Sequence, residues 1–376
     1  MARLWPRLRE NEARSECPCP RSSDPTPHEK KEVEGSVGRI ACLGPGPTHL
    51  IEFTRSSLGV IGAAKNPGLM SLRPRSRTDC RRAKADAVKD KVTTTALRAR
   101  KGQGEKIAVA TAYDATMAGL LDEAGVDVLM IGDSLGMVIQ GFDSTLPVTL
   151  EQMIYHSACV ARARPRAHVV CDLPFLSYQA SEEQAILAAG RLLKEGFAES
   201  VKLEGGRSVV RSVERIVAAG IPVMGHLGLT PQSVHQFGGF RVQGKTEKAA
   251  RDLLDDAQML VEAGVYSIVL EGVPSDVATW ITQSISVPTI GIGAGPDTDG
   301  QVLVSYDLLG LYRGHKPKFV RRFAQLGDDV VAATREYVKS VRDGSFPGPE
   351  HGFVMSAGEH VPGADGEDSS RTGNTQ

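Results

Sequence analysis

The 376-residue sequence has few cysteines and few aromatic residues, and its cysteines form no recognisable pattern. Two of the six lie in a polar segment, two stand alone and two lie among apolar residues: Cys17 and Cys19, Cys42 and Cys80, and Cys159 and Cys171. None has the spacing of a zinc site or of a disulfide framework. We therefore expect reduced thiols, with no structural role for sulfur chemistry.

The sequence also has no excess of positive or negative charge and no long apolar run. The formal net charge is -1, which gives no bias toward nucleic acid or an anionic membrane. No apolar run approaches the roughly 18 residues that a membrane helix needs, and the N-terminus lacks the hydrophobic centre of a secretory signal. With 41% hydrophobic residues, the chain is expected to be a cytoplasmic globular protein with a large core.

Both ends of the chain differ in composition from its middle. Residues 1–90 are rich in Arg, Pro, Glu and Ser and show no sustained period, apart from a short apolar patch near Leu58 to Ala64. We predict that this leader is mostly disordered, with Met70 as an alternative start. It is too acidic and too rich in Pro to resemble an organelle transit peptide. Residues 356–376 are polar and Gly-rich, which predicts a disordered tail.

Residues 91–355 alternate short apolar runs with amphipathic segments. Strands are predicted over Ile107–Thr111, Val128–Ile131, Val169–Cys171, Val201–Leu203, Val223–Gly225, Ser267–Leu270, Thr289–Ile292 and Val302–Val304. Helices are predicted over Ala115–Ala124, after Thr149 and Ser181 with capping boxes to Gln152 and Gln184, and over Val209–Ala219, Glu247–Ala263 and Ser275–Ser284.

This alternation fixes the predicted fold class. About eight strand-helix units, over a span close to the ~250 residues that are typical, predict an α/β fold of the (β/α)8 or TIM barrel type. The catalytic domain would cover residues 91–355 and would end, after the barrel strands, with a closing helix over Asp328–Val341. A doubly wound open sheet is the alternative, but it offers ligand groups at one switch point rather than at nearly every strand end.

Five of the apolar runs finish on an ionisable side chain. These residues are Asp133, Asp172, Lys202 with Glu204, His226 and Glu271. In a barrel the C-terminal strand ends converge on one pocket, so Asp133, Asp172 and Glu204 would bring three carboxylates within reach of one ion. Oxygen-only ligation suits a hard cation such as Mg²⁺. For each aspartate alone, the alternative is a turn or helix-capping role.

The other three residues also leave alternatives open. Lys202 shares a strand face with Glu204 and would bind a substrate anion, form a Schiff base, or form an ion pair with Glu204. His226 is an acid, a hydrogen-bond donor or a satisfied buried imidazole. Glu271 follows an apolar wall, which raises the pKa of a carboxyl toward that of a useful base; its alternative is to cap the helix near Ser275.

A glycine-rich run, Gly291 to Gly295, follows the seventh predicted strand. It lacks the full spacing of a dinucleotide-binding fingerprint and is weak by itself. After the seventh strand of a barrel, such a turn binds phosphate or lets the backbone pass close to a ligand.

Several strings together resemble the ketopantoate hydroxymethyltransferase family. They are TAYD from Thr111, GDSLGMVIQGFDSTLPVT from Gly132, DLPF, VKLEGG, GHLGLTPQSV, GGFRVQG, LEGVP, IGIGAG and GHKPKF. The resemblance covers residues 92–352, and the second string is highly specific. It departs at the N-terminus, because members of the family usually begin shortly before the first strand.

The resemblance implies a (β/α)8 barrel, commonly a decamer, that opens pantothenate synthesis. It implies that Asp133 and Asp172 bind Mg²⁺ with Glu204 completing the sphere, and that Glu271 is the proton acceptor. The 2-oxo acid would be held at the metal by Asp133 and Asp172, and by Ser134 and Lys202, with His226 near it. The implied reaction transfers a hydroxymethyl group from 5,10-methylenetetrahydrofolate to 3-methyl-2-oxobutanoate. Without the resemblance, the residues predict only metal-assisted proton abstraction from the carbon beside a carbonyl group.

Two other functions compete with this hypothesis. A lyase or mutase of the phosphoenolpyruvate mutase and isocitrate lyase type would also hold Mg²⁺ and a 2-oxo acid, but isocitrate lyases usually carry a catalytic Cys in a flexible loop, and no such loop is present. A non-enzymatic metabolite-binding barrel would lack the base, whereas Glu271 is present. Either way, the expected partners are small molecules, with no nucleic acid and no membrane.

Overall fold

Eight parallel strands close into a barrel in the computed structural model, which describes residues 91–314 and 316–359. They are β1 (Ile107–Thr111), β2 (Val128–Ile131), β3 (His168–Asp172), β4 (Ser200–Glu204), β5 (Val223–Gly228), β6 (Ser267–Glu271), β7 (Thr289–Ile292) and β8 (Gly300–Leu303). Pairing of β1 with β8, with Val109 opposite Val302, completes the ring. The predicted barrel is therefore confirmed. The leader predicted for residues 1–90, and the predicted tail from residue 360 onward, lie outside the described residues.

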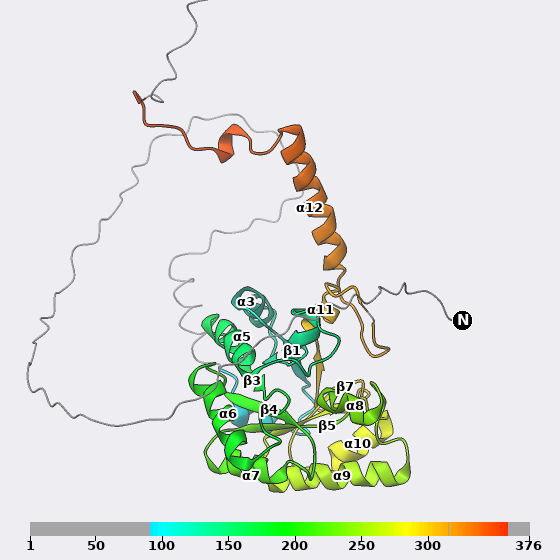
Figure 1. Cartoon of the computed structure of the whole chain (residues 1–376). Helices are drawn as coiled ribbons and strands as arrows, with labels where there is room; N and C mark the ends of the chain where they lie inside the picture. Colours follow the sequence, from blue (N-terminus) through cyan, green and yellow to red (C-terminus); the bar gives the residue numbers. More distant parts are fainter. Residues whose placement is uncertain (1–90, 315, 360–376) are drawn as a thin grey trace, which may run out of the picture. The chain divides into compact units, whose positions relative to one another are not determined.

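Helices surround the strands, as Figure 1 shows for α3, α5, α6, α7, α9 and α10. The longer ones are α3 (Ala115–Glu123), α5 (Leu150–Arg162), α6 (Glu182–Lys194), α7 (Val210–Ala218), α9 (Glu247–Glu262), α10 (Ser275–Ser284) and α12 (Leu326–Asp343). Shorter ones are α2 (Thr94–Ala99), α4 (Leu135–Val138), α8 (Val234–Phe237), α11 (Ser305–Leu308) and the 3₁₀ turns η1 (Pro231–Ser233) and η2 (Pro349–His351).

The two predicted capping boxes differ in outcome. At the start of α5, the backbone N–H of Gln152 donates to the Thr149 hydroxyl, and the side-chain oxygen of Gln152 accepts from the backbone N–H of Thr149, so the box is complete. At the start of α6, Ser181 accepts from the Gln184 backbone, but the Gln184 side chain donates to the Leu176 carbonyl instead. The second box was therefore predicted only half correctly, because the bond to the Leu176 carbonyl turns the Gln184 side chain away from the Ser181 backbone N–H.

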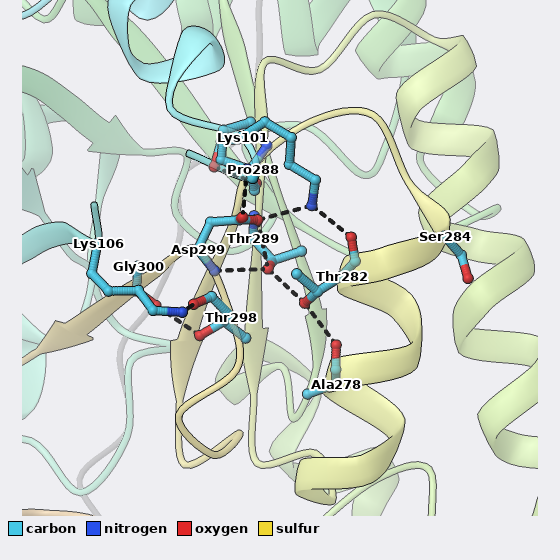
Figure 2. Close-up of polar contacts among 12 residues, drawn as sticks. Lys101, Lys106, Ala278, Thr282, Ser284, Pro288, Thr289, Thr298, Asp299 and Gly300 are labelled. Atoms are coloured by element: carbon cyan, nitrogen blue, oxygen red, sulfur yellow. Dashed lines mark hydrogen bonds and ion pairs between the residues drawn. The ribbon is translucent and has the colours of Figure 1, made fainter. Parts of the chain in front are cut away.

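The predicted helices include none between the seventh and eighth strands, and the structure agrees for β7 and β8. Residues 293–299, all of them described, join these strands as a loop without a helix. Figure 2 shows what fixes the start of both strands: the Asp299 carboxylate accepts from Lys101 Nζ and from the Thr289 backbone, each at 2.9 Å. At the glycine-rich run, a Cβ on Gly295 would lie 2.1 Å from Ser275 Oγ, so packing against the protein requires a glycine there.

Alternate residues of the strands fill the barrel interior. Val170, Met224 and Val269 belong to one buried cluster, to which Val92 and Leu97, before β1, also belong. Because side chains alternate along a strand, the residue two positions further toward the C-terminal end points into the same interior. That position is Asp172 after Val170, His226 after Met224 and Glu271 after Val269. The apolar filling below thus leaves the C-terminal rim as the place where polar groups meet.

The predicted closing helix forms as α12, but it does not pack as the barrel helices do. Gly327 is its only buried residue, and Val330, Tyr337 and Val341 are 55%, 56% and 46% exposed. Among the helices that the structure describes, none is long and apolar enough to cross a membrane.

Candidate active site

The strand register brings the predicted site residues side by side at the C-terminal rim. Asp172 of β3 lies opposite Lys202 of β4, and Glu204 of β4 lies opposite His226 of β5. Gly228 at the end of β5 lies opposite Glu271 of β6, and the Leu229 backbone donates to the Glu271 carbonyl at 2.7 Å. Four strands separated along the chain therefore contribute to one cluster, as the barrel hypothesis predicts.

Asp172 contacts both Asp133 and Lys202 in this cluster. Its Oδ2 accepts from the Asp133 backbone N–H at 3.1 Å and lies 3.1 Å from Lys202 Nζ in a buried ion pair. Its Oδ1 is buried and has no hydrogen-bond partner among the described residues. The ion pair considered for Lys202 with Glu204 is thus formed with Asp172 instead. The helix-capping alternative also fails for Asp133, because Ser134 is the N-cap of α4 and makes no capping bond.

His226 connects Lys202 to Glu271. Lys202 Nζ lies 3.3 Å from His226 Nδ1, and His226 Nε2 lies 3.3 Å from Glu271 Oε2, although without the angles of a hydrogen bond. An ammonium group can only donate, so Nδ1 is the acceptor and the proton of a neutral ring sits on Nε2, facing Glu271. Burial, followed by the charge of Lys202, lowers the pKa of His226 well below its usual range, which keeps the ring neutral.

Glu271 lies on β6 in surroundings that favour a base working near neutral pH. Burial raises the pKa of Glu271 to about 7, while the charge of Lys202 acts in the opposite direction. The helix-capping alternative is wrong, because α10 has Pro274 at its N-cap position and no side-chain cap. The apolar wall recognised in the sequence thus has the expected electrostatic effect.

The cluster carries more negative than positive charge. Four buried or largely buried carboxylates, Asp133, Asp172, Glu204 and Glu271, surround one ammonium, Lys202. Burial and the charge of Asp172 raise the pKa of Asp133 to about 7, and burial with the charge of Asp133 raises the pKa of Glu204 well above its usual range. Burial opposes the charge on Lys202, but attraction to Asp172 and Glu204 outweighs it and raises the pKa of Lys202.

Two residues that the sequence argument did not assign also meet the rim. Gln232, in η1 after β5, donates to Asp133 from its side chain and to Glu204 from its backbone. Tyr113, after β1, lies 3.0 Å from the Ser134 hydroxyl, and its carbonyl is 2.8 Å from His156 Nδ1. Both lie inside strings that carry the family resemblance. Neither ends a strand-like run, which is the pattern that predicted the other site residues.

The fit of a cation rests on these carboxylates. In the described parts, 91–314 and 316–359, no group of three His, Cys, Asp or Glu side chains is arranged to hold a metal ion by itself. Mg²⁺, however, usually keeps water or substrate oxygens in its coordination sphere, so protein side chains alone need not form a complete site. The unpartnered Oδ1 of Asp172, beside Asp133 and among excess carboxylates, is the kind of atom that such an ion satisfies.

Comparison with known proteins places the chain among characterised sequences. A sequence model of the family described as ketopantoate hydroxymethyltransferase matches residues 91–349. The 3-methyl-2-oxobutanoate hydroxymethyltransferase of Moorella thermoacetica is 57% identical over 267 residues, which cover 71% of this chain and 99% of that protein. The same enzyme of Syntrophus aciditrophicus is 53% identical over 264 residues, covering 70% and 97%.

Solved structures give a weaker match. A 2,3-dimethylmalate lyase of the PEP mutase/isocitrate lyase superfamily overlaps with a TM-score of 0.45 and 17% identity, over 67% of this chain and 85% of that one. An overlap this low favours no particular activity.

Proposed function

The chain belongs to the ketopantoate hydroxymethyltransferase family, and from that premise we propose that it transfers a hydroxymethyl group from 5,10-methylenetetrahydrofolate to 3-methyl-2-oxobutanoate. The product would be 2-dehydropantoate, formed on the route to pantothenate. The observation that carries the proposal is the rim of the barrel, where a carboxyl with a pKa of about 7, Glu271, faces a cluster able to hold an anion and a cation.

We propose Mg²⁺ as the cation, held by Asp133 and Asp172 with Glu204 completing the sphere. A bound Mg²⁺ would supply electrophilic stabilisation of negative charge on the keto oxygen of the substrate. The excess of carboxylates over ammonium groups supports a divalent cation at this place, since it relieves the repulsion between buried like charges.

The residues of the chain have separable parts in the proposed reaction. Lys202 and Ser134 hold the 2-oxo acid, because an ammonium and a hydroxyl on the rim can pair with a carboxylate. Glu271 takes the proton from C3, and the electron pair of the broken C–H bond forms the nucleophile that attacks the one-carbon unit. Both bonds from that carbon to the folate nitrogens break, water supplies the hydroxyl oxygen of the product, and the two nitrogens take up the proton from C3 and the remaining proton of the water.

His226 has a supporting part. Its neutral ring presents Nε2 toward Glu271 and accepts from Lys202, so it keeps the base and the anion-binding ammonium in fixed relation, with its edge at the substrate. The lowered pKa of His226 favours a hydrogen-bond donor near the substrate over an acid, because the neutral ring has no second proton to donate at neutral pH.

The test is a direct assay of product. The purified chain is incubated with 3-methyl-2-oxobutanoate, 5,10-methylenetetrahydrofolate and Mg²⁺, and 2-dehydropantoate is measured by mass spectrometry. Product that depends on all three additions, and that is lost in Glu271→Gln, supports the proposal. A lyase or mutase of the phosphoenolpyruvate mutase type would consume a 2-oxo acid without the folate donor, and a binding barrel would consume nothing.

We also propose that the enzyme is a cytoplasmic homo-oligomer, a decamer by its resemblance to the family. The exposed apolar residues of α12 support association, because surface of this kind is commonly covered by a partner. Light scattering coupled to size-exclusion chromatography tests the oligomeric state: a monomer at micromolar concentration contradicts the proposal.

A further inference from the structure

Gln232 is a buried residue in the turn after β5 whose side-chain amide has a single possible orientation. The Tyr178 hydroxyl and the Gln179 Nε2 group approach Oε1 at 2.8 and 3.1 Å. Gln179 Nε2 can only donate, so the atom facing it must be the carbonyl oxygen of Gln232. The Gln232 Nε2 group therefore points the other way, toward Asp133.

The donors of Gln232 reach two carboxylates that belong to different strands. Nε2 donates to Asp133 Oδ2 at 2.8 Å and to the Leu173 carbonyl at 3.0 Å. The backbone N–H of Gln232 donates to Glu204 Oε2 at 2.9 Å. Both donors and the acceptor of the side-chain amide are thus used, and one residue links the rims of β2 and β4.

These bonds leave the opposite oxygen of each carboxylate without a donated hydrogen bond. Among the described residues, neither Asp133 Oδ1 nor Glu204 Oε1 takes part in a hydrogen bond, and His226 Nδ1 lies 3.6 Å from Glu204 Oε1. Asp172 is arranged in the same way: Oδ2 is held by the protein, and Oδ1 is buried with no hydrogen-bond partner in the part of the chain that the structure describes. Each of the three carboxylates is held on one side only.

We propose that Gln232 is a positioning residue for the cation site, which fixes one oxygen of Asp133 and one of Glu204 so that the other oxygen of each faces the metal. The inference rests on the proposed function, since it takes Mg²⁺ to bind at these carboxylates. Gln232 does not touch the metal or the substrate in this role. Groups that orient metal ligands through hydrogen bonds typically change metal affinity or activity by about 10- to 100-fold when they are lost.

The experiment compares Gln232→Met with Gln301→Met. Methionine keeps the length of the glutamine side chain but removes the side-chain donors, while the backbone bond to Glu204 remains. Gln301 is a matched control, because its Nε2 also donates two hydrogen bonds, to the Gly295 carbonyl and to Thr298 Oγ1, away from the carboxylates. Mn²⁺, which also prefers oxygen ligands, is the probe, and free Mn²⁺ is counted by electron paramagnetic resonance.

For Gln232→Met we expect a Mn²⁺ dissociation constant raised by about 10- to 100-fold, and for Gln301→Met a change of less than about 3-fold. Proton exchange from 3-methyl-2-oxobutanoate should recover most of its rate at saturating Mg²⁺, because the loss lies in metal binding and not in the base. A folded Gln232→Met protein with the wild-type Mn²⁺ affinity overturns the inference, as does an equal loss in Gln301→Met.

A second variant covers the case in which Gln232→Met does not fold. Tyr178→Phe keeps Gln232 but removes the hydroxyl that bonds both to Gln232 Oε1 and to the Glu204 backbone, so the Mn²⁺ dissociation constant should still rise, by several-fold. An unchanged value overturns the inference. If the wild-type protein forms 2-dehydropantoate and the variants bind Mn²⁺ as the wild type does, only the role of Gln232 is refuted and the proposed function stands. Wild-type protein that neither binds Mn²⁺ nor forms product refutes the proposed function with it.

Discussion

If Glu271 is the base, the rate of proton removal from C3 must follow its ionisation. Burial raises the pKa of Glu271 to about 7, so at pH 7 about half of the molecules carry the ionised form that accepts a proton. Exchange at saturating substrate and Mg²⁺ should therefore rise with pH and level off above about pH 8. It should be about tenfold below its plateau at pH 6. A carboxyl with its ordinary pKa near 4.5 would give a flat profile from pH 6 to pH 8.

Glu271→Gln tests the same assignment by removing the base without changing its shape. A positioned base contributes roughly 10²- to 10⁴-fold, so exchange should fall by about that factor and lose its dependence on pH. The assay follows loss of the C3 hydrogen signal of 3-methyl-2-oxobutanoate in deuterated water by proton NMR, without folate, so that only the first step is measured. Mn²⁺ binding by the variant should remain, which separates a lost base from a lost site.

Two results refute this reasoning in different ways. Exchange by Glu271→Gln at the wild-type rate means that the base lies elsewhere, and His226 is then the next residue to test. A wild-type profile that is flat between about pH 5.5 and pH 8 leaves the base in place but refutes the raised pKa, and with it the claim that burial outweighs the charge of Lys202.

Three further substitutions or deletions give separate expectations. Asp172→Asn keeps the volume of the side chain but removes a ligand charge, so Mg²⁺ affinity and turnover should both fall, and high Mg²⁺ should partly restore turnover. Unchanged metal dependence in a Mg²⁺ titration would leave Asp172 only as the ion-pair partner of Lys202. Lys202→Met should raise KM for the 2-oxo acid more than it lowers kcat, as steady-state kinetics would measure, and a loss confined to kcat would speak against an anion-binding role. A chain that starts at Ala87 should keep its thermal melting temperature and turnover, because the family match begins at residue 91; a marked loss of either would show that the removed residues contribute.

Features that depend on short-range periodicity could be predicted from the sequence alone. Strand side chains alternate, so an acid two residues beyond an inward apolar residue had to share its face, as Asp172 does with Val170 and Glu271 with Val269. The sequence of strands and helices determined the closed parallel barrel, and hence the end at which these residues meet. The capping box at Thr149 is equally local, and it formed as predicted.

Which side chains form ion pairs and hydrogen bonds across the C-terminal rim depends on the tertiary structure. Lys202 bonds to Asp172, on the neighbouring strand, and not to Glu204 on its own, because the register of β3 and β4 sets the two at the same height. Gln232 lies 99 positions from Asp133, so no local pattern could connect them. The bond from Lys101 to Asp299 has the same cause. Closure of the barrel joins the two ends of the strand order, so distance along the chain then says little about distance in space.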